Sequence, residues 1–203
     1  MNSIENKLFS FSELSAAAKS AAVETVRNSE SYLSWDWFDA VKEDFHQILN
    51  IIGFYDIDSM FSGFWSQGDG ASFTGRYSYE KGCLKAIKEY APQDEKLHEL
   101  VESIVTRQKP HFYKLECVIY SASIYCHAHT MRFEWTKEGN YFDWRNGYEE
   151  DEIEDTFRGL ANWYYERLEK EYEYLMSDDA LTDYIEANEI LFTEDGKRIG
   201  SGY

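Results

Sequence analysis

Two strand patterns and the turn between them occupy residues 54–79, FYDIDSMFSGFWSQGDGASFTGRYSY. Aromatic and apolar residues recur through residues 54–65 and 71–79, which is typical of strands, and the turn at 66–70 is polar and contains glycine. A connection of this length joins antiparallel neighbours, because parallel strands need a crossover of about a dozen residues or more. The pattern therefore predicts an antiparallel hairpin.

Amphipathic helices are predicted on both sides of this hairpin. Residues 36–52 repeat apolar side chains at spacings of three and four, and Gly53 suits the position just after that helix. Asp94 is the predicted N-cap of a helix over residues 94–108. Further helices are predicted from Ser12 or Ser15 to residue 28 and at 80–90, 149–175 and 178–188, with strands at 7–11, 112–120 and 124–136 and a small hairpin around Asp195.

The order of these elements predicts the fold class. Helices and hairpins come in blocks without strict βαβ alternation, which favours an α+β fold. We expect an antiparallel sheet of hairpins packed against several amphipathic helices. No linker, repeat or low-complexity segment interrupts the chain, so we expect a single domain over residues 1–203.

The composition predicts a cytoplasmic protein without a membrane partner. The first residues lack the charged and then apolar layout of a secretory signal, and no window approaches the roughly 18 apolar residues of a membrane span. Cys83, Cys117 and Cys126 are odd in number and show no CxxC spacing. The sequence therefore predicts neither a disulfide framework nor a zinc knuckle.

Negative charge is concentrated in one part of the chain. The net charge is −18, and residues 138–189 contain 17 acidic and 4 basic residues. Such a surface repels phosphate backbones, so we expect no direct binding of nucleic acid. Solubility is the simple explanation, and the alternative is a surface that imitates DNA or attracts a basic partner.

The acids of the predicted helix 149–175 are the candidate partner-binding residues. Three of them recur on one helix face at successive steps of about 5–6 Å, and the others stand where a helix dipole favours negative charge. A solvated helix face explains the same residues, and Lys170 weakens a pure mimic of DNA. The candidates are Glu149, Glu150, Asp151, Glu152, Asp155, Glu166, Glu169 and Glu173.

The turn of the hairpin is a candidate binding loop. It consists of Ser66, Gln67, Gly68, Asp69 and Gly70, which could present backbone amides and one carboxylate to a ligand. The alternative is a hairpin turn in which the short polar side chains satisfy the turn's own amides. No GxxxxGK[ST] pattern is present, so a P-loop is excluded.

His127 and His129 are the candidate metal ligands. On a predicted strand 124–136 they would share one face, as half of a zinc site. Their aromatic neighbours favour core histidines instead. No GxSxG or HExxH pattern occurs, so the sequence identifies no catalytic residues, and we expect no bound metal and no cofactor.

Three segments resemble a known protein family: FSGFWSQGDGASFTG (61–75), AIKEYAPQDEKLHEL (86–100) and FTEDGKRI (192–199). The family consists of small acidic proteins found mostly in tailed bacteriophages, prophages and plasmids, and its members are sometimes labelled antitoxin-like. The resemblance runs from FSELS (11–15) to the GKRI ending. It implies a phage or mobile-element origin and the cytoplasm of an infected host cell, and it brings no catalytic residues.

Charge and resemblance together predict an accessory protein that binds a host or defence-system protein with a basic surface. It would inhibit that protein in the manner of an anti-CRISPR, an anti-restriction protein or an antitoxin. The alternative is a small ligand- or metal-binding enzyme that uses the SQGDG loop. An oligomer is also open, because six Trp and sixteen Tyr exceed the apparent need of one core.

Overall fold

The computed structural model describes residues 7–121, 125–141 and 149–198, without the side chains of residues 149–151. The chain forms two compact units. The first, here the sheet unit, is Asp39–Glu169, and the second, here the terminal unit, joins Met1–Phe38 to Lys170–Tyr203. The expectation of one domain stays a prediction.

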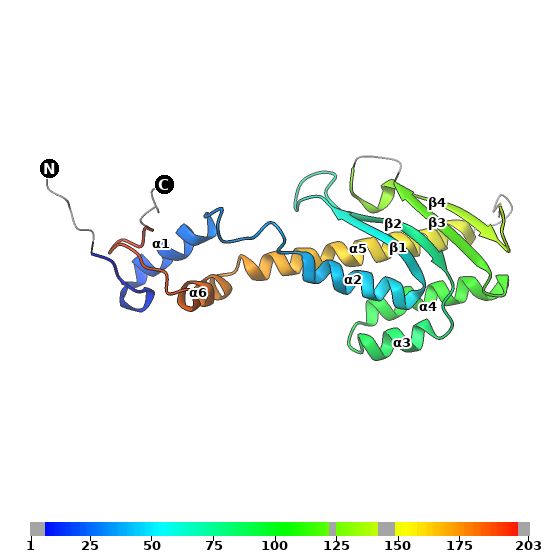
Figure 1. Ribbon diagram of the computed structural model, residues 1–203, viewed down its shortest axis with the longest axis horizontal. Helices are drawn as coiled ribbons and strands as arrows, with labels where there is room; N and C mark the ends of the chain where they lie inside the picture. The colour runs from blue at the N-terminus through cyan, green and yellow to red at the C-terminus, as the bar shows by residue number, and fades with distance from the viewer. Residues whose placement is uncertain (1–6, 122–124, 142–148, 199–203) are drawn as a thin grey trace. The chain divides into compact units, whose positions relative to one another are not determined.

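The sheet unit is built on a five-stranded antiparallel sheet (Figure 1). Its strands follow one another in sequence order and each neighbouring pair is antiparallel, with residues 79–114, which include two α-helices, between β2 and β3. The predicted antiparallel sheet and α+β class are thereby confirmed. The strands are β1 (Phe54–Phe61), β2 (Ala71–Ser78), β3 (Leu115–Ser121), β4 (Met131–Lys137) and β5 (Asn140–Tyr141).

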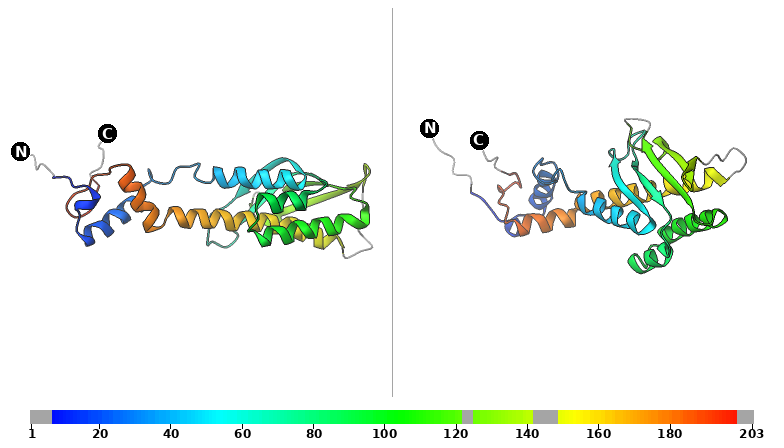
Figure 2. Two further views of the ribbon diagram at one scale, coloured as in Figure 1. Left: turned by 90° about the horizontal axis from the view of Figure 1, so that it is seen from below. Right: turned by 45° about the vertical axis from the view of Figure 1, so that its right-hand side comes forward.

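Helices cover one face of this sheet (Figures 1 and 2). The ring of Phe157, in α5, lies 4.9 Å from that of Phe54 and 5.1 Å from that of Tyr77. Phe45, in α2, stacks on Tyr164 of α5 at 4.3 Å. The helices of the unit are α2 (Asp39–Ile52), α3 (Cys83–Tyr90), α4 (Glu95–Gln108) and the larger part of α5 (Glu149–Leu175).

The strands place alternate residues on the two faces of the sheet. In β3, Cys117 and Ile119 are buried under the helices, whereas Val118 and Tyr120 are exposed on the opposite face. Among the described residues, no α-helix packs on that exposed face (Figure 2). We call it the outer sheet face.

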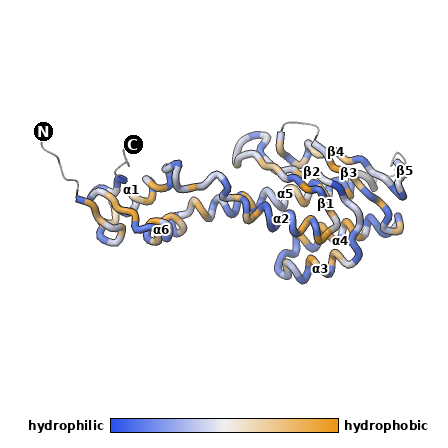
Figure 3. The backbone as a smooth tube through the Cα atoms, viewed as in Figure 1, coloured by the Kyte–Doolittle hydropathy of each residue, from blue (hydrophilic) through white to orange (hydrophobic). Residues whose placement is uncertain are grey.

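The terminal unit pairs α1 (Ala16–Arg27) with α6 (Asp178–Ala187). Ser15 and Ser177 are the N-caps, each accepting a hydrogen bond from a backbone amide of its helix. Hydrophobic positions recur along these helices, as along α2 (Figure 3). The buried core is Phe11, Leu14, Ala18, Ala22, Val23, Val26, Leu181, Ile185 and Phe192.

Several predicted boundaries differ from the structure. The predicted strand 7–11 is only an isolated bridge between Phe9 and Phe192, followed by the 3-10 helix Phe11–Glu13. The predicted strand from residue 112 begins at Leu115, because Phe112 and Tyr113 have left-handed backbones. Among the described residues, no helix has the length and apolar character that a membrane crossing requires.

The prediction of a strand over 124–136 is wrong at its start. Residues Ala128–Thr130 form a 3-10 helix, and β4 begins only at Met131. The Thr130 hydroxyl donates to the carbonyls of His127 (2.7 Å) and Tyr125 (3.0 Å), which closes the chain into a turn. A local side chain to backbone bond thus competes successfully with strand pairing.

Candidate functional site

The SQGDG loop is held by its own polar groups. The Asp69 carboxylate accepts from the amide of Ser66 at 2.8 Å, and the amide of Asp69 donates to the Ser66 carbonyl at 3.1 Å. The Ser62 hydroxyl accepts from the Gly70 amide at 3.2 Å. One Asp69 oxygen therefore bonds to an amide of the turn itself, as expected of a hairpin turn whose polar side chains satisfy its own amides.

The loop nevertheless exposes polar and aromatic side chains. Ser66, Gln67 and Gly68 are exposed, and Gly68 has a φ of +91° that favours glycine. The Trp65 side chain is 68% exposed. The backbone φ of Trp65 is +69°, a conformation uncommon for a bulky residue. Holding it there costs about 1–2 kcal/mol. Sequence reasoning did not single out Trp65, although a tryptophan beside a polar glycine turn was a usable signal.

Helix α5 meets this loop through Tyr165. The Tyr165 hydroxyl donates to the carbonyl of Gly63 at 3.0 Å, and its ring lies 5.4 Å from that of Phe64. Burial raises the pKa of Tyr165, and the negative charges of Asp69 and Glu169 raise it further. A loop and a helix face that are remote in sequence therefore meet on one surface. We call it the loop–helix patch: Trp65, Ser66, Gln67, Asp69, Tyr165 and Glu169.

Other predicted acids of α5 are partly neutralised. Glu166 forms an ion pair with Lys96 at 2.6 Å, and Asp155 pairs with Arg158 at 3.0 Å. Glu152 pairs with Arg107. A base beside a carboxylate cancels much of its field at a distance, so these three acids add less to a negative surface than their number implies.

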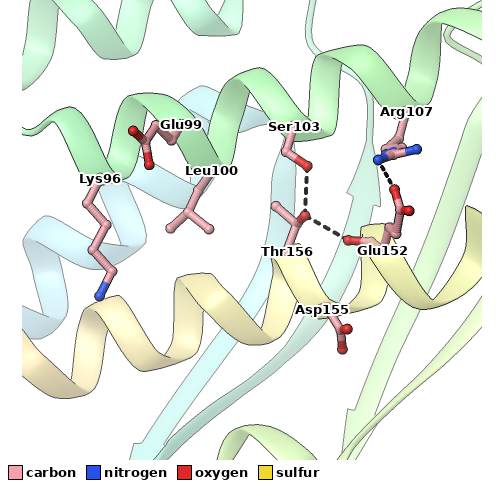
Figure 4. A pocket seen from close by; sticks show the side chains of 8 residues that line it. All are labelled: Lys96, Glu99, Leu100, Ser103, Arg107, Glu152, Asp155 and Thr156. Atoms are coloured by element: carbon pink, nitrogen blue, oxygen red, sulfur yellow. Dashed lines mark hydrogen bonds and ion pairs between the residues drawn. The ribbon is translucent and has the colours of Figure 1, made fainter.

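Two of these acids line a groove between α4 and α5 of about 510 Å³ (Figure 4). Several of the side chains that line the groove bond to one another. The Ser103 and Thr156 hydroxyls lie 2.9 Å apart, and Arg107 forms an ion pair with Glu152. The close approach of the two helices here is shown by Gly159, where a Cβ would lie only 2.7 Å from Leu100. The lining residues are Lys96, Glu99, Leu100, Ser103, Arg107, Glu152, Asp155 and Thr156.

The remaining predicted acids divide between the units. Glu169 is half-buried in the sheet unit, and Glu173 is exposed on the part of α5 in the terminal unit. Neither forms an ion pair with another described residue. The side chains of Glu149, Glu150 and Asp151 lie outside the described residues. A single interaction surface made of all eight acids stays a prediction.

His127 and His129 lie in the turn before β4, so the predicted shared strand face is wrong. The Nδ1 atom of His127 accepts from the backbone amide of His129 at 3.2 Å. That bond uses a lone pair that a metal would need. His127 also packs on Gly70, where a Cβ would lie 2.7 Å from the His127 Cβ. The described residues contain no group of three or more His, Cys, Asp or Glu placed to hold a metal.

A histidine–serine pair that the sequence did not reveal lies beneath the sheet. His46 Nε2 and Ser59 Oγ share a hydrogen bond of 2.8 Å. Burial lowers the pKa of His46, Lys42 lowers it further, and Asp58 opposes them. Ser59 is only 4% exposed, so no substrate reaches its hydroxyl. The pair resembles a nucleophile and base only in distance, and acts as a satisfied core contact.

Comparisons with known proteins identify one family. The model of a domain of unknown function, DUF8835, matches residues 37–178. That range includes the whole sheet unit and the loop–helix patch. No curated protein and no solved structure matches the chain.

Proposed function

We propose that this chain, which belongs to the DUF8835 family, a domain of unknown function, is a phage-type accessory protein. It inhibits a host defence or toxin protein by binding a basic surface on that protein. The inhibition is steric and needs no catalytic residue. The observation that carries the proposal is the loop–helix patch, in which the exposed Trp65 belongs to the same loop as Asp69, and Asp69 and Glu169 both act on Tyr165.

The chemistry of the patch fits a basic partner. Tryptophan is enriched among the anchor residues of protein interfaces, and its ring face attracts Lys and Arg. Asp69 and Glu169 supply negative charge near the phenol of Tyr165. The strained backbone of Trp65 favours a functional role, because such conformations cluster at binding sites.

The charge of the whole chain supports the same partner class. A net charge of −18 speeds encounter with a positive surface and makes the association sensitive to salt. Proteins that handle DNA or RNA carry such basic surfaces, because they bind phosphate backbones. Attraction between an acidic chain and such a basic surface would serve anti-CRISPR, anti-restriction and antitoxin-like inhibition alike.

The ion pairs of α5 narrow the proposed contact surface. Because Glu152, Asp155 and Glu166 are paired with bases, we assign the direct contact to Asp69 and Glu169 and leave the paired acids a supporting role. A partner must also displace little to reach Trp65, whose side chain is already exposed. The preformed ring keeps the ordering cost of binding low.

The test is a capture experiment from a bacterial host lysate with the full chain as bait. At low salt we expect recovery of a basic protein that handles nucleic acid, with loss of that protein at high salt. The captured protein is then purified and its activity on DNA or RNA measured with and without the chain. Recovery of no such protein at either salt, or full activity of the captured protein at saturating chain, would refute the proposal.

Matched variants locate the contact. Trp65→Ala is expected to weaken binding by about 30-fold, since truncating a central aromatic anchor costs about 2 kcal/mol or more. Glu169→Gln is expected to weaken binding at low salt only. The controls are Trp35→Ala, at a tryptophan that is 86% exposed in the terminal unit, and Glu80→Gln, at an exposed acid outside the patch. Equal losses in the controls would remove the patch from the proposal.

A further inference from the structure

The outer sheet face displays large apolar side chains that the fold leaves uncovered. Tyr55, Met60, Val118 and Tyr120 stand on β1 and β3, each between 36% and 43% exposed. Tyrosine and methionine are enriched in the cores of protein interfaces.

Charge on this face follows an ordered row. Arg76 of β2 is the direct neighbour of Val118 in β3, and Val118 is the direct neighbour of Glu134 in β4. Neighbouring strands lie about 4.8 Å apart, so the arginine and the glutamate flank β3 at equal distances. A base, an apolar residue and an acid thus stand in one line across three strands.

We propose that the outer sheet face binds a second copy of this chain through a two-fold axis that lies between the two copies of β3 and bisects the small angle between them. Such an axis places Val118 against its own copy and Arg76 of each chain against Glu134 of the other. The row is therefore self-complementary, as a closed two-fold interface requires. Packed sheets lie about 10 Å apart, a gap that an arginine and a glutamate side chain bridge together.

The local charges favour a second copy over a basic or acidic partner. Arg76 and Arg132 on the outer sheet face offset its acids, whereas the whole chain carries −18. These two arginines therefore reduce the mutual repulsion of two copies that meet at this face. Arg76 is available for this role, because its contact with Asp56 is long, at 3.7 Å, and both side chains are more than half exposed.

One residue opposes the arrangement. Glu116, two residues before Val118 on β3, would face its own copy across the same axis. Packed sheets cross at about 30°, which moves positions away from the crossing point apart. The apolar contacts of Val118 and Tyr120 and the two reciprocal Arg76–Glu134 pairs outweigh this local repulsion.

Charge reversal tests the pairing directly. The full chain is expected to sediment as a dimer, whereas Arg76→Glu and Glu134→Arg, each alone, are expected to weaken the dimer by about 100-fold or more, because each creates two like-charge contacts. An equimolar mixture of the two variants is expected to form a heterodimer, since both contacts then join opposite charges. The double variant is expected to dimerise as well. Lys88→Glu and Glu99→Arg, at exposed helix positions, serve as controls that leave the dimer intact.

Restoration in the mixture also shows that both variants fold, which circular dichroism checks independently. A monomeric wild-type chain at high concentration overturns the proposal. So does a dimer that survives both single reversals, because another surface or another occupant then accounts for it. Failure here leaves the loop–helix patch untouched, since the two surfaces share no residue.

Discussion

At the scale of single residues, Phe157 explains much of the aromatic content of the chain. Its ring lies within 6 Å of the rings of Phe54, Tyr77, Phe133 and Trp135, which belong to β1, β2 and β4, three of the four long strands of the sheet. Aromatic pairs at these distances add stabilisation beyond the area that they bury. Part of the high aromatic content is therefore explained by packing in the core.

Replacing this ring is expected to open the centre of the sheet unit. Phe157→Ala is expected to lower the free energy of unfolding by about 3–5 kcal/mol, through lost burial and the cavity left behind. Chemical denaturation followed by circular dichroism measures the loss. Phe112→Ala, at a phenylalanine that is 77% exposed, is the matched control and is expected to change stability little. Similar losses in both variants would contradict the central role of Phe157.

His46 is expected to make stability depend on pH. Its pKa is lower in the folded chain than its ordinary value of about 6.5, so the unfolded chain binds the proton more readily. Stability is therefore complete above pH 6.5 and falls as pH drops from there through the lowered folded pKa. The charged groups that act on His46 are Lys42, which lowers its pKa, and Asp58, which raises it.

The variant His46→Gln, which cannot titrate, isolates this effect. Denaturation of both proteins at several pH values between 5 and 8 is expected to show a smaller fall in stability for the variant. The His98→Gln variant is the control, since His98 is another half-buried histidine, bonded to the carbonyl of Ala91. An identical pH slope in wild type and His46→Gln would show that His46 does not supply it.

At the scale of elements, glycine sets the join between α2 and β1. Gly53 follows Ile52 directly, as the sequence predicts, with a φ of +114°. A Cβ there would lie 2.1 Å from the backbone oxygen of Ser78. The first strand can therefore pack beside β2 only because this position has no side chain.

Two glycine substitutions separate backbone strain from steric clash. Gly53→Ala is expected to cost about 2–5 kcal/mol, because a left-handed alanine and an overpacked contact both destabilise. Gly82→Ala, with a φ of +88° and open space around its Cβ, is expected to cost only about 1–2 kcal/mol. Thermal and chemical denaturation measure both. A cost at Gly82 equal to that at Gly53 would mean that the Ser78 contact adds nothing.

A second element, α4, is tied to α5 through its N-cap. One oxygen of Asp94 accepts from the amide of Leu97 and the other from the indole of Trp163, each at 2.9 Å. Asp94→Ala is expected to cost about 2–4 kcal/mol, because the cap is lost and a buried indole N–H is left unpaired. Ser177→Ala, which removes only the cap of α6, is expected to cost about 1 kcal/mol. Equal losses in the two variants would show that the indole contact adds little.

At the scale of the whole molecule, self-repulsion acts against the folded state. With a net charge of −18, screening by added sodium chloride is expected to stabilise the chain. A gain of about 1 kcal/mol corresponds to about 2–4 °C in melting temperature for a chain of this size. A variant with Glu171, Glu186 and Glu194 changed to Gln is expected to respond less. A melting temperature that falls with salt would show that the surface ion pairs dominate instead.

Much of the fold was predictable, and the candidate site was predictable only in pieces. The antiparallel hairpin, the helix over 149–175 and the caps at Ser15 and Asp94 agree with their local patterns. The SQGDG loop was identified, but not its meeting with Tyr165. The strand over 124–136 failed at its start, because the Thr130 hydroxyl bonds leave no mark on hydrophobic periodicity.

The sequence by itself determined the type of each main element, the antiparallel pairing and the negative charge, because periodicity, turn residues and composition act over a few neighbouring positions. Only the tertiary structure decided which acids stay unpaired and which loop joins which helix. Lys96 and Glu166 lie 70 positions apart, and Gly63 and Tyr165 lie 102 apart. Contacts over such separations depend on how elements pack, and packing is settled by the shapes of buried side chains from the whole unit together.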